Sequence, residues 1–333
     1  MDADLVAITE RYRRFARDEA PSRSPVYARW AARVSADPPL QRILAAIAPH
    51  RRQPPLVFAV ARLLGLADDA DDDEFADWVR GNGDRLRTEC ERRSLQTNEP
   101  QRCAALLPAL GLIDGPIALL EVGASAGLCL YPDRYSYRYV GGDRVVAQLD
   151  PADGPSEVTL TCRVRGDRMP PVTLPDVVWR AGIDLNPLDP GAASTAEWLT
   201  ALVWPGESGR TERIRAALRI AAHEPPHLVA ADAAEALPAV AAEAPRGATL
   251  VITTPGVLVH LPAQSRSRVI TQARRLGRWV TLDAPGLHDG WVPDSVSPWR
   301  DGFALAVDGE VRAAADPLGG WVEWRTGERA RVG

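Results

Sequence analysis

The sequence predicts an α/β protein in which a helical N-terminal segment precedes a mostly parallel β-sheet. Two observations carry this prediction. Before residue 115, apolar residues recur only at helical spacing, whereas from Gly115 onward short apolar runs alternate with helical stretches. A chain of 333 residues is long enough for one large α/β domain and a smaller appendage. We therefore expect a helical cap domain over residues 1–114 and a second, sheet-containing domain over residues 115–333.

Helical spacing of apolar residues defines the elements of the first third. The stretches that show it cover residues 5–15, 27–34, 40–47 and 75–93. Pairs of prolines at 38–39 and 54–55 are start and stop signals for these helices. Asn98 and Gln101 are expected to cap a further helix that ends near Leu110.

Short apolar runs define the strands of the second part. Those expected to form the core of the parallel sheet are residues 117–122, 177–183, 227–231, 249–253 and 279–282. A helix is expected directly after Gly127. Residues 135–140 and 158–164 predict a β-hairpin or small subsheet inserted at about residues 131–170. The tail, with a turn at Asp308-Gly309, predicts an antiparallel ending.

Composition excludes several classes of function. The net charge of −5 argues against a nucleic-acid partner, and the absence of lysine excludes Schiff-base and P-loop lysine chemistry. The cysteines form no CxxC pair, so we expect no metal site and a reducing compartment. No signal peptide is visible, and the most apolar stretch, residues 56–66, is too short to span a membrane. We expect a cytoplasmic protein with a small-molecule substrate and no membrane partner; its oligomeric state is left open.

The stretch EVGASAGL lies where the first core strand ends. Small residues at such a turn let the backbone approach a ligand closely, and the start of the following helix would offer free N–H groups. The candidate cofactor-binding residues in this stretch are Glu121, Gly123, Ala124, Ser125 and Gly127.

Polar residues also follow the next three core strands. An acid at the end of the second core strand can accept the hydroxyl groups of a ribose, and ligands of open α/β sheets bind outside the carboxyl ends of the strands. The further candidate cofactor-binding residues at these strand ends are Asp184, Leu185, Asn186, Asp232, Ala233 and Thr254.

The order Glu-x-Gly, Asp, Asp-Ala at successive strand ends resembles the S-adenosylmethionine (SAM) binding motifs of class I methyltransferases. The resemblance covers roughly residues 115–285 and implies a Rossmann-like fold and a SAM-dependent methyltransferase acting on a small molecule. It implies that residues 123–127 hold the methionine portion, Asp184 the ribose and Asp232 the adenine. The sequence departs from the motif at Ser125, where glycine is usual, and in the long gap before Asp184.

Nearly the whole chain also resembles a bacterial family known as domain of unknown function 2332. The segments that carry this match are RSLQTNEPQRCAA at 93–105, EVGASAGL at 121–128, residues 133–135, 182–187, 204–205, 225–226 and 321–324. The chain departs from the family pattern at Cys129, where Asn is expected, at Thr254-Pro255, where His-Ser is expected, and at His260, where Tyr is expected. Residues 281–284 (TLDA) replace a segment that usually carries Asn-Glu.

Two residues are candidates for a catalytic role. His260 follows a strand end that should face the cofactor, and histidine is the commonest general base. Tyr135 lies in the polar stretch Asp133-Arg134-Tyr135. The candidate substrate-binding residues, which surround the first core strand in the sequence, are Arg93, Gln96, Asn98, Glu99, Arg102, Asp133 and Arg134.

Two alternative functions remain open at this point. A SAM-binding protein of the same fold could carry out another reaction or none. Residues 123–127 also spell the G-x-S-x-G of serine hydrolases, with Ser125 as nucleophile and Asp283 and His288 in the required order. Residues 223–227 spell the H-E-x-x-H motif of zinc enzymes. They do not predict a zinc site, because the two prolines would break the helix that such a site needs.

Overall fold

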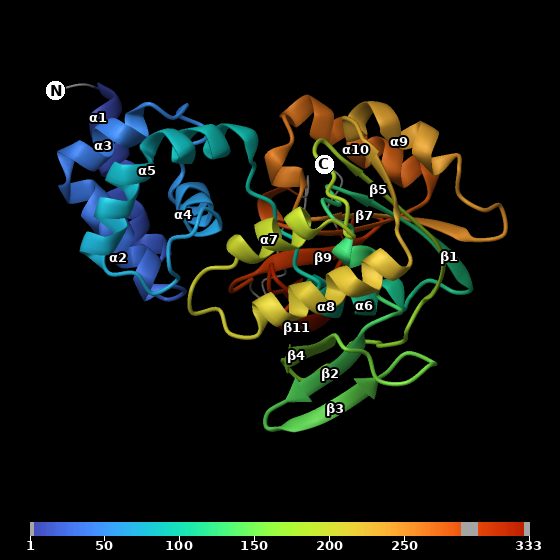
Figure 1. The fold of residues 1–333 in the computed structure, drawn as a ribbon. Helices are drawn as coiled ribbons and strands as arrows, with labels where there is room; N and C mark the ends of the chain where they lie inside the picture. Colours follow the sequence, from blue (N-terminus) through green and yellow to red (C-terminus); the bar gives the residue numbers. More distant parts are fainter. Residues whose placement is uncertain (1–2, 288–298, 330–333) are drawn as a thin grey trace. The chain divides into compact units, whose positions relative to one another are not determined.

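A computed structural model describes residues 3–287 and 299–329. The chain divides into two compact units, Met1–Thr97 with Ala193–Arg215 and Asn98–Ala192 with Ala216–Gly333 (Figure 1). These bounds differ from those of the two domains expected from the sequence, and the domain division itself stays a prediction.

The first unit is helical, as its apolar spacing predicts. Its helices are α1 (Ala3–Arg14), α2 (Pro25–Ala36), α3 (Pro38–Ala45), α4 (Pro54–Leu63), α5 (Asp72–Arg92) and α7 (Ala193–Ala201), with a short π-helix at Phe15–Glu19. Proline occupies the first turns of α2, α3 and α4, where its missing N–H costs nothing. Asp71 and Glu74 form a capping box that starts α5.

Aromatic side chains form the core of the first unit. Trp30 stacks on Phe75 with ring centroids 4.9 Å apart, and Phe58 meets both rings edge-on. Tyr27 contacts Phe58 and Trp204 at 5.0 and 5.5 Å. Such pairs contribute about 0.5–1.5 kcal/mol each beyond their burial, so this cluster accounts for the packing of α2, α4 and α5.

The second unit is built on a mixed sheet of eleven strands. In chain order the strands are β1 (Pro116–Val122), β2 (Ser136–Gly141), β3 (Arg144–Leu149), β4 (Thr159–Arg165), β5 (Asp176–Asp184), β6 (His227–Ala230), β7 (Thr249–Pro255), β8 (Arg278–Asp283), β9 (Phe303–Val307), β10 (Glu310–Ala315) and β11 (Trp321–Arg329). Their order across the sheet is β3-β2-β4-β11-β10-β9-β8-β7-β1-β5-β6. The α/β class is therefore confirmed.

The five predicted core strands all exist and lie together. They follow the order β6-β5-β1-β7-β8, and every pairing among them is parallel. Strands β9, β10 and β11 then continue the sheet in antiparallel fashion, so the antiparallel tail is confirmed. The turn between β9 and β10 contains Asp308 and Gly309, both at positive φ, as the sequence indicates.

The inserted strands pair differently from the prediction. Residues 136–141 (β2) and 159–165 (β4) are parallel neighbours, so they do not form a hairpin with each other. The hairpin consists of β2 and β3, which Figure 1 shows in green at the end of the sheet opposite β6. A Gly-Gly-Asp turn at 141–143 connects them, and this turn signal precedes the strand that sequence reasoning missed.

The remaining helices of the second unit are α6 (Arg102–Leu110), α9 (Ala233–Ala241) and α10 (Ala263–Leu276), together with most of α8 (Arg210–His223). Leu120, Val122 and Ile252 pack in one cluster with apolar residues of α9 and α10. Because side chains alternate along a strand, Glu121 points to the other face of the sheet. Helix α6 contacts β4, β8 and β9.

The predicted helix after Gly127 is wrong. Only a 3-10 helix, Leu128–Leu130, follows the turn. Tyr131 precedes Pro132, and the residue before a proline is pushed out of the helical region, which ends the turn and leads into β2.

The predicted capping pair of α6 is also wrong. Gln101 stands at the N-cap, but its side chain makes no capping hydrogen bond. Its amide instead donates to the carbonyl oxygens of Thr161 and Gly319, each at 3.0 Å. Asn98 is used elsewhere, as the next section describes. Within residues 3–287 and 299–329, no helix has the length and apolar character to cross a bilayer.

Candidate functional site

The candidate site lies at the carboxyl ends of the parallel strands. Glu121 in β1 pairs in register with Gly182 of β5 on one side and Thr253 of β7 on the other. Strand β5 ends in Asp184 and β8 ends in Asp283. Parallel pairing therefore brings acidic residues from three strands to one edge of the sheet.

The backbone N–H groups of the turn after β1 are used in hydrogen bonds within the second unit. The N–H groups of Gly123 and Gly127 donate to Ile183 O at 2.8 Å and to Ala124 O at 2.7 Å. Those of Ser125 and Ala126 donate to side chains, to Asp184 Oδ2 at 2.8 Å and Asn98 Oδ1 at 3.0 Å. The N–H groups of the turn are therefore engaged within the protein, and only the short 3-10 helix Leu128–Leu130 follows it.

Glycines allow this turn to pack tightly. A Cβ on Gly123, which has φ of 76°, would lie 2.6 Å from Val257 Cγ2. A Cβ on Gly182 would lie 2.4 Å from Ala124 Cβ. Both contacts are closer than any side chain tolerates, so glycine is required at both positions for packing within the chain.

Asn98 and Ser125 form a buried pair in the second unit. Asn98 Nδ2 donates to Ser125 Oγ, while Asn98 Oδ1 accepts the N–H of Ala126. Both residues are buried, and Ser125 has φ of 51°, a left-handed conformation that a residue with a side chain adopts at a cost. Asn98, which precedes α6 in the sequence, therefore fixes the turn 123–127 through these two hydrogen bonds.

Asp184 holds the same turn from β5. Its Oδ2 accepts the Ser125 N–H, and its Oδ1 accepts the Asn186 N–H at 2.8 Å. A carboxylate offers about four acceptor sites, so Asp184 can still bind a ligand hydroxyl. The neighbouring Leu185 is 70% exposed and offers an apolar surface beside the carboxylate.

Asp232, which follows β6, also accepts a backbone N–H and keeps acceptor capacity. Its Oδ1 accepts the N–H of Ala234 at 2.8 Å and so caps α9, whose first residue is Ala233. The other carboxylate oxygen makes no described hydrogen bond within residues 3–287 and 299–329.

Glu121 is a buried acid of the site. It is 4% exposed, and its Oε2 has no hydrogen-bond partner among the described residues. Burial raises the pKa of Glu121 well above its ordinary value, and the neighbouring Cys129 and Asp184 raise it further, while Arg102 opposes them. Burial therefore favours the protonated form of this carboxyl group.

Arg102 reaches the same edge from the start of α6. Its Nε donates to Pro317 O at 2.9 Å and its Nη1 to Pro255 O at 3.1 Å. Glu99, which is 1% exposed, accepts the N–H of Gln101 and so orders the residues just before α6. Glu99 O also accepts from Cys129 Sγ at 3.5 Å.

Asp283 is a further buried acid that the methyltransferase resemblance did not include. Its Oδ2 accepts from Thr281 Oγ1 at 3.2 Å, and its Oδ1 makes no hydrogen bond of good geometry within the described residues. Burial raises the pKa of Asp283 to about 7, against the lowering effect of Thr281, of the Leu258 and Gly256 N–H groups and of Arg102. The signal for it was present, because Asp283 ends a strand just as Asp184 does.

Two candidates around β7 have different surroundings. Thr254 is buried, and its hydroxyl accepts from Trp279 Nε1 at 3.0 Å, on the face covered by α9 and α10. His260 ends the short 3-10 helix Leu258–His260 and is exposed. No described contact joins its side chain to Glu121 or Arg102 in the part of the chain that the structure covers. The catalytic role of His260 stays a prediction.

Asp133 and Arg134 belong to a separate charged network. Asp133 forms a two-fold ion pair with Arg180 at 2.7 and 2.8 Å, and the Arg180 side chain is only 4% exposed. Arg134 pairs with Glu224 at 2.9 Å. Arg180 and Glu224 were missed by sequence reasoning, although an arginine within an apolar strand is an unusual feature that could have drawn attention to Arg180.

Tyr135 is fully buried next to this network. Its hydroxyl donates to Leu128 O at 2.7 Å, and burial raises its pKa well above the ordinary value. This contact gives Tyr135 a structural role, and its catalytic role stays a prediction.

The other two candidate substrate-binding residues lie in the first unit. Arg93 forms an ion pair with Glu89 at 3.1 Å, and its guanidinium lies 4.7 Å from the ring centroid of Trp198. Gln96 precedes the boundary between the units.

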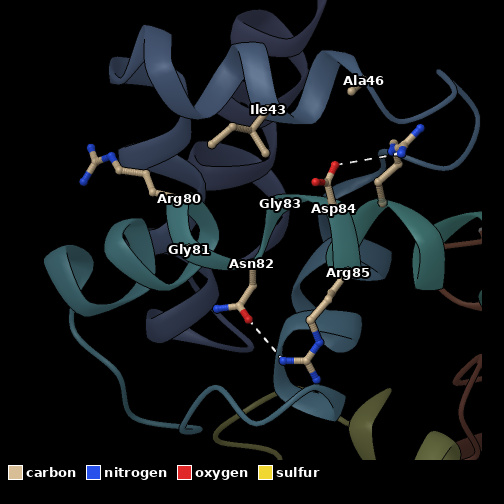
Figure 2. Close-up of a pocket in the computed structure, with 9 residues that line it drawn as sticks. Ile43, Ala46, Arg80, Gly81, Asn82, Gly83, Asp84 and Arg85 are labelled. Atoms are coloured by element: carbon tan, nitrogen blue, oxygen red, sulfur yellow. Dashed lines mark hydrogen bonds and ion pairs between the residues drawn. The ribbon is translucent and has the colours of Figure 1, made fainter.

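Two pockets lie away from the strand ends. One, of about 590 Å³, is lined by Arg134, Asp153, Glu157, Arg219, Ile220, His223 and Glu224. The other, of about 290 Å³, lies in the first unit beside a kink of α5 at Asn82. Figure 2 shows that Arg80 and Arg85 there point away from each other, and that Arg85 bonds Asn82. Since these arginines do not converge, we assign this pocket no ligand.

Comparison with known protein families identifies the chain. A sequence model of the family described as "Uncharacterized protein conserved in bacteria (DUF2332)" matches residues 9–324. The chain belongs to this family. The searches among curated proteins and among solved structures gave no match.

Three segments by which the sequence resembles the DUF2332 family meet at the candidate site. Asn98, of the segment 93–105, bonds Ser125 and Ala126 of the turn, and Asp184, of the segment 182–187, bonds Ser125. The family-typical Trp321 starts β11 and places its ring under the Arg165 guanidinium at 3.7 Å. Within the described part of this family member, no three His, Cys, Asp or Glu side chains gather closely enough to hold a metal ion.

Proposed function

We propose that the second unit binds SAM at the carboxyl ends of β1, β5 and β6, and that the protein is a SAM-dependent methyltransferase acting on a small molecule. The observation that carries the proposal is the combination of strand order with acid position. Numbered in chain order, the five parallel strands lie 3-2-1-4-5, the order of the first five strands of a Rossmann sheet. The first three of them end in or are followed by Glu121, Asp184 and Asp232.

The position of the site follows from this order. In open α/β sheets, ligands bind where the strand order reverses, outside the carboxyl ends of the strands. Here the reversal lies between β1 and β7, next to Glu121. The proposal of a Rossmann-like, methyltransferase-type core rests on the same order.

The residues at this edge suit the nucleoside part of SAM. Asp184 and Asp232 each keep acceptor capacity, for ribose hydroxyls and for an adenine amino group. The exposed Leu185 can lie against an adenine ring. The unpartnered Glu121 Oε2 suits a donor such as an ammonium group. The turn 123–127, in contrast, keeps its N–H groups for internal bonds, so it supports the cofactor through its shape.

Methyl transfer from SAM requires little of the protein beyond positioning the two reactants. When bound, SAM supplies an electrophilic methyl group that a nucleophile takes in an in-line displacement. Asp283 is the group at this edge whose pKa, at about 7, suits the exchange of a proton near neutral pH. We therefore assign the proton-accepting role to Asp283 ahead of the exposed His260.

Calorimetric titration with SAM and S-adenosylhomocysteine tests the proposal. Asp232→Asn keeps the cap of α9 but removes the charge, and Leu185→Glu adds a charge at an exposed position. Asp189→Asn is the matched control, because Asp189 also accepts a backbone N–H, that of Gly191, in the loop after β5. We expect saturable binding that weakens about ten-fold or more in the first two variants and persists in the control.

The outcomes separate the possible functions. Absence of binding to the folded protein at millimolar cofactor would overturn the proposal. Binding without formation of S-adenosylhomocysteine across candidate acceptors would favour a non-methylating SAM-binding protein of the same fold. Binding that is unchanged in Asp232→Asn and Leu185→Glu would place the cofactor elsewhere.

A serine hydrolase is the second candidate, because of one observation. Ser125 has φ of 51°, and a nucleophile elbow holds its serine in a similarly strained conformation. However, Ser125 is 4% exposed and its Oγ accepts from Asn98. The histidine expected for this reaction, His288, lies outside the described residues. Labelling by a fluorophosphonate that is lost in Ser125→Ala supports this function, and failure to label rejects it.

A further inference from the structure

Arg102 is held rigidly and keeps donors to spare. Two of its N–H groups donate to Pro317 O and Pro255 O. A guanidinium has five N–H donors, so three remain. Its Nη2 lies where a Cβ on Gly256 would be 2.9 Å away, so the absence of a side chain at Gly256 makes room for it. The guanidinium therefore presents a fixed edge that its protein contacts do not saturate.

No acid neutralises Arg102 in the described part of the chain. It forms no ion pair there, and both of its hydrogen bonds go to carbonyl oxygens. The acids close enough for Arg102 to affect their pKa are Glu121 and Asp283. Burial favours the neutral form of both carboxyl groups, so neither of them supplies Arg102 with a full counter-charge.

We propose that Arg102 is an anion-binding residue that takes a carboxylate group of the ligand bound at the carboxyl ends of β1, β7 and β8. A planar guanidinium with free N–H groups on adjacent nitrogens matches a carboxylate in two-fold geometry. Pro255, whose carbonyl oxygen Arg102 bonds, ends β7, and Gly256, which leaves room for the guanidinium, follows it. Arg102 consequently lies by the ends of β7 and β8, whereas Asp184 and Asp232 lie by the ends of β5 and β6.

Two sources can supply this carboxylate, and the inference in this form rests on the proposed function. SAM carries one on its methionine portion, and the turn 123–127 keeps its own N–H groups engaged. The acceptor substrate can carry the other. Both sources share the same recognition chemistry, so the experiment has one arm for each.

The first arm uses acetate alone and needs no cofactor. The midpoint of thermal unfolding is followed as acetate replaces chloride at constant ionic strength. A ligand that binds only the folded state raises this midpoint. We expect acetate to stabilise the wild type, Arg102→Gln to lose that effect, and Arg102→Lys to keep part of it because the charge remains. Arg138→Gln is the control, since Arg138 is paired with Asp150 at 2.9 Å.

The second arm compares S-adenosylhomocysteine with 5′-methylthioadenosine, which lacks the carboxylate. If the cofactor supplies the anion, Arg102→Gln weakens binding of the first about ten-fold and leaves the second unchanged. If the substrate supplies it, neither affinity changes while the acetate effect is lost.

Different results would contradict the proposed SAM binding and the proposed anion site at Arg102. Acetate stabilisation that depends on Arg102, without any binding of the nucleosides, contradicts the proposed cofactor and leaves the anion site standing. Acetate stabilisation and nucleoside affinities that are all indifferent to Arg102→Gln, in a folded variant, overturn the anion site.

Discussion

Asp184 Oδ2 accepts a hydrogen bond from the backbone N–H of Ser125 at 2.8 Å, so the end of β5 fixes the turn that follows β1. The same carboxylate also accepts the N–H of Asn186. One side chain thus holds two strand ends in a defined relation, and the candidate site depends on it whichever ligand it takes.

Replacing Asp184 by Ala should destabilise the protein. Each of the two lost bonds from a backbone N–H to a carboxylate is expected to cost about 1.5–3 kcal/mol, so we expect a loss of about 3–6 kcal/mol in the free energy of unfolding. Urea denaturation measures this. Asp189→Ala is the control, because Asp189 is exposed and its carboxylate accepts just one N–H, that of Gly191, among the described residues. Equal losses in the two variants would contradict the role given to Asp184.

The Asp133–Arg180 pair should be costly to break and cheap to replace. Asp133→Asn leaves a guanidinium that is 4% exposed without its main counter-charge, which costs about 3–5 kcal/mol. Asp133→Leu combined with Arg180→Met removes both charges and should lose much less than the sum of the single changes. A double-mutant cycle from denaturation curves measures the difference. Additive losses would show that the pair contributes nothing as a pair.

Asp283 should make the stability depend on pH. Its pKa rises from 3.8 to about 7 on folding, so between these values the folded state holds a proton that the unfolded state has released. The free energy of unfolding therefore falls as pH rises from about 4 to about 7, by up to about 4 kcal/mol from this group, and is constant above that.

The isosteric Asp283→Asn variant tests this pH dependence. It should remove this part of the slope and be more stable than the wild type at pH 8, because no charge is buried there. Asn can still accept from Thr281 Oγ1. Denaturation curves of both proteins at several pH values give the difference directly. A difference that does not vary with pH would rule out this titration.

Gly123→Ala should be destabilising for two separable reasons. The new Cβ meets Val257 Cγ2 at 2.6 Å, and φ of 76° disfavours any side chain. We expect a loss of about 2–4 kcal/mol. Gly115→Ala is the matched control, since Gly115 has φ of 75° with nothing within 4 Å, and should lose only the backbone part of about 1–2 kcal/mol. In the Val257→Ala background, the cost of Gly123→Ala should fall to that smaller value.

Sequence periodicity predicted the core strands because burial dictates their composition. The apolar runs at 117–122 and 249–253 could form nothing but strands buried on both faces, and both lie in the middle of the sheet. Strand β3 was missed because its residues are mostly exposed, so no core imposes a pattern on them. The parallel pairing of β2 with β4 was missed because the unpredicted β3 lies between them in the sequence and forms the hairpin with β2.

The candidate site could be predicted only in outline. The acids Glu121 and Asp184 were found because strand ends of parallel sheets gather at one edge. The hydrogen bonds of Asn98 to Ser125 and Ala126 could not be predicted, because local rules favour Asn as a helix cap. The burial of Asp283, which gives it its pKa, arises from the packing of the turn after β7 and leaves no trace in local sequence.

The position of β11 has a consequence for how the chain folds during synthesis. This strand comes after all the other described strands in the sequence, yet it lies between β4 and β10. During synthesis β2, β3 and β4 emerge from the ribosome long before their link to the rest of the sheet exists. We expect β4 to keep an open strand edge until β11 has emerged, so that removal of β11 would expose this edge of residues 159–165 again.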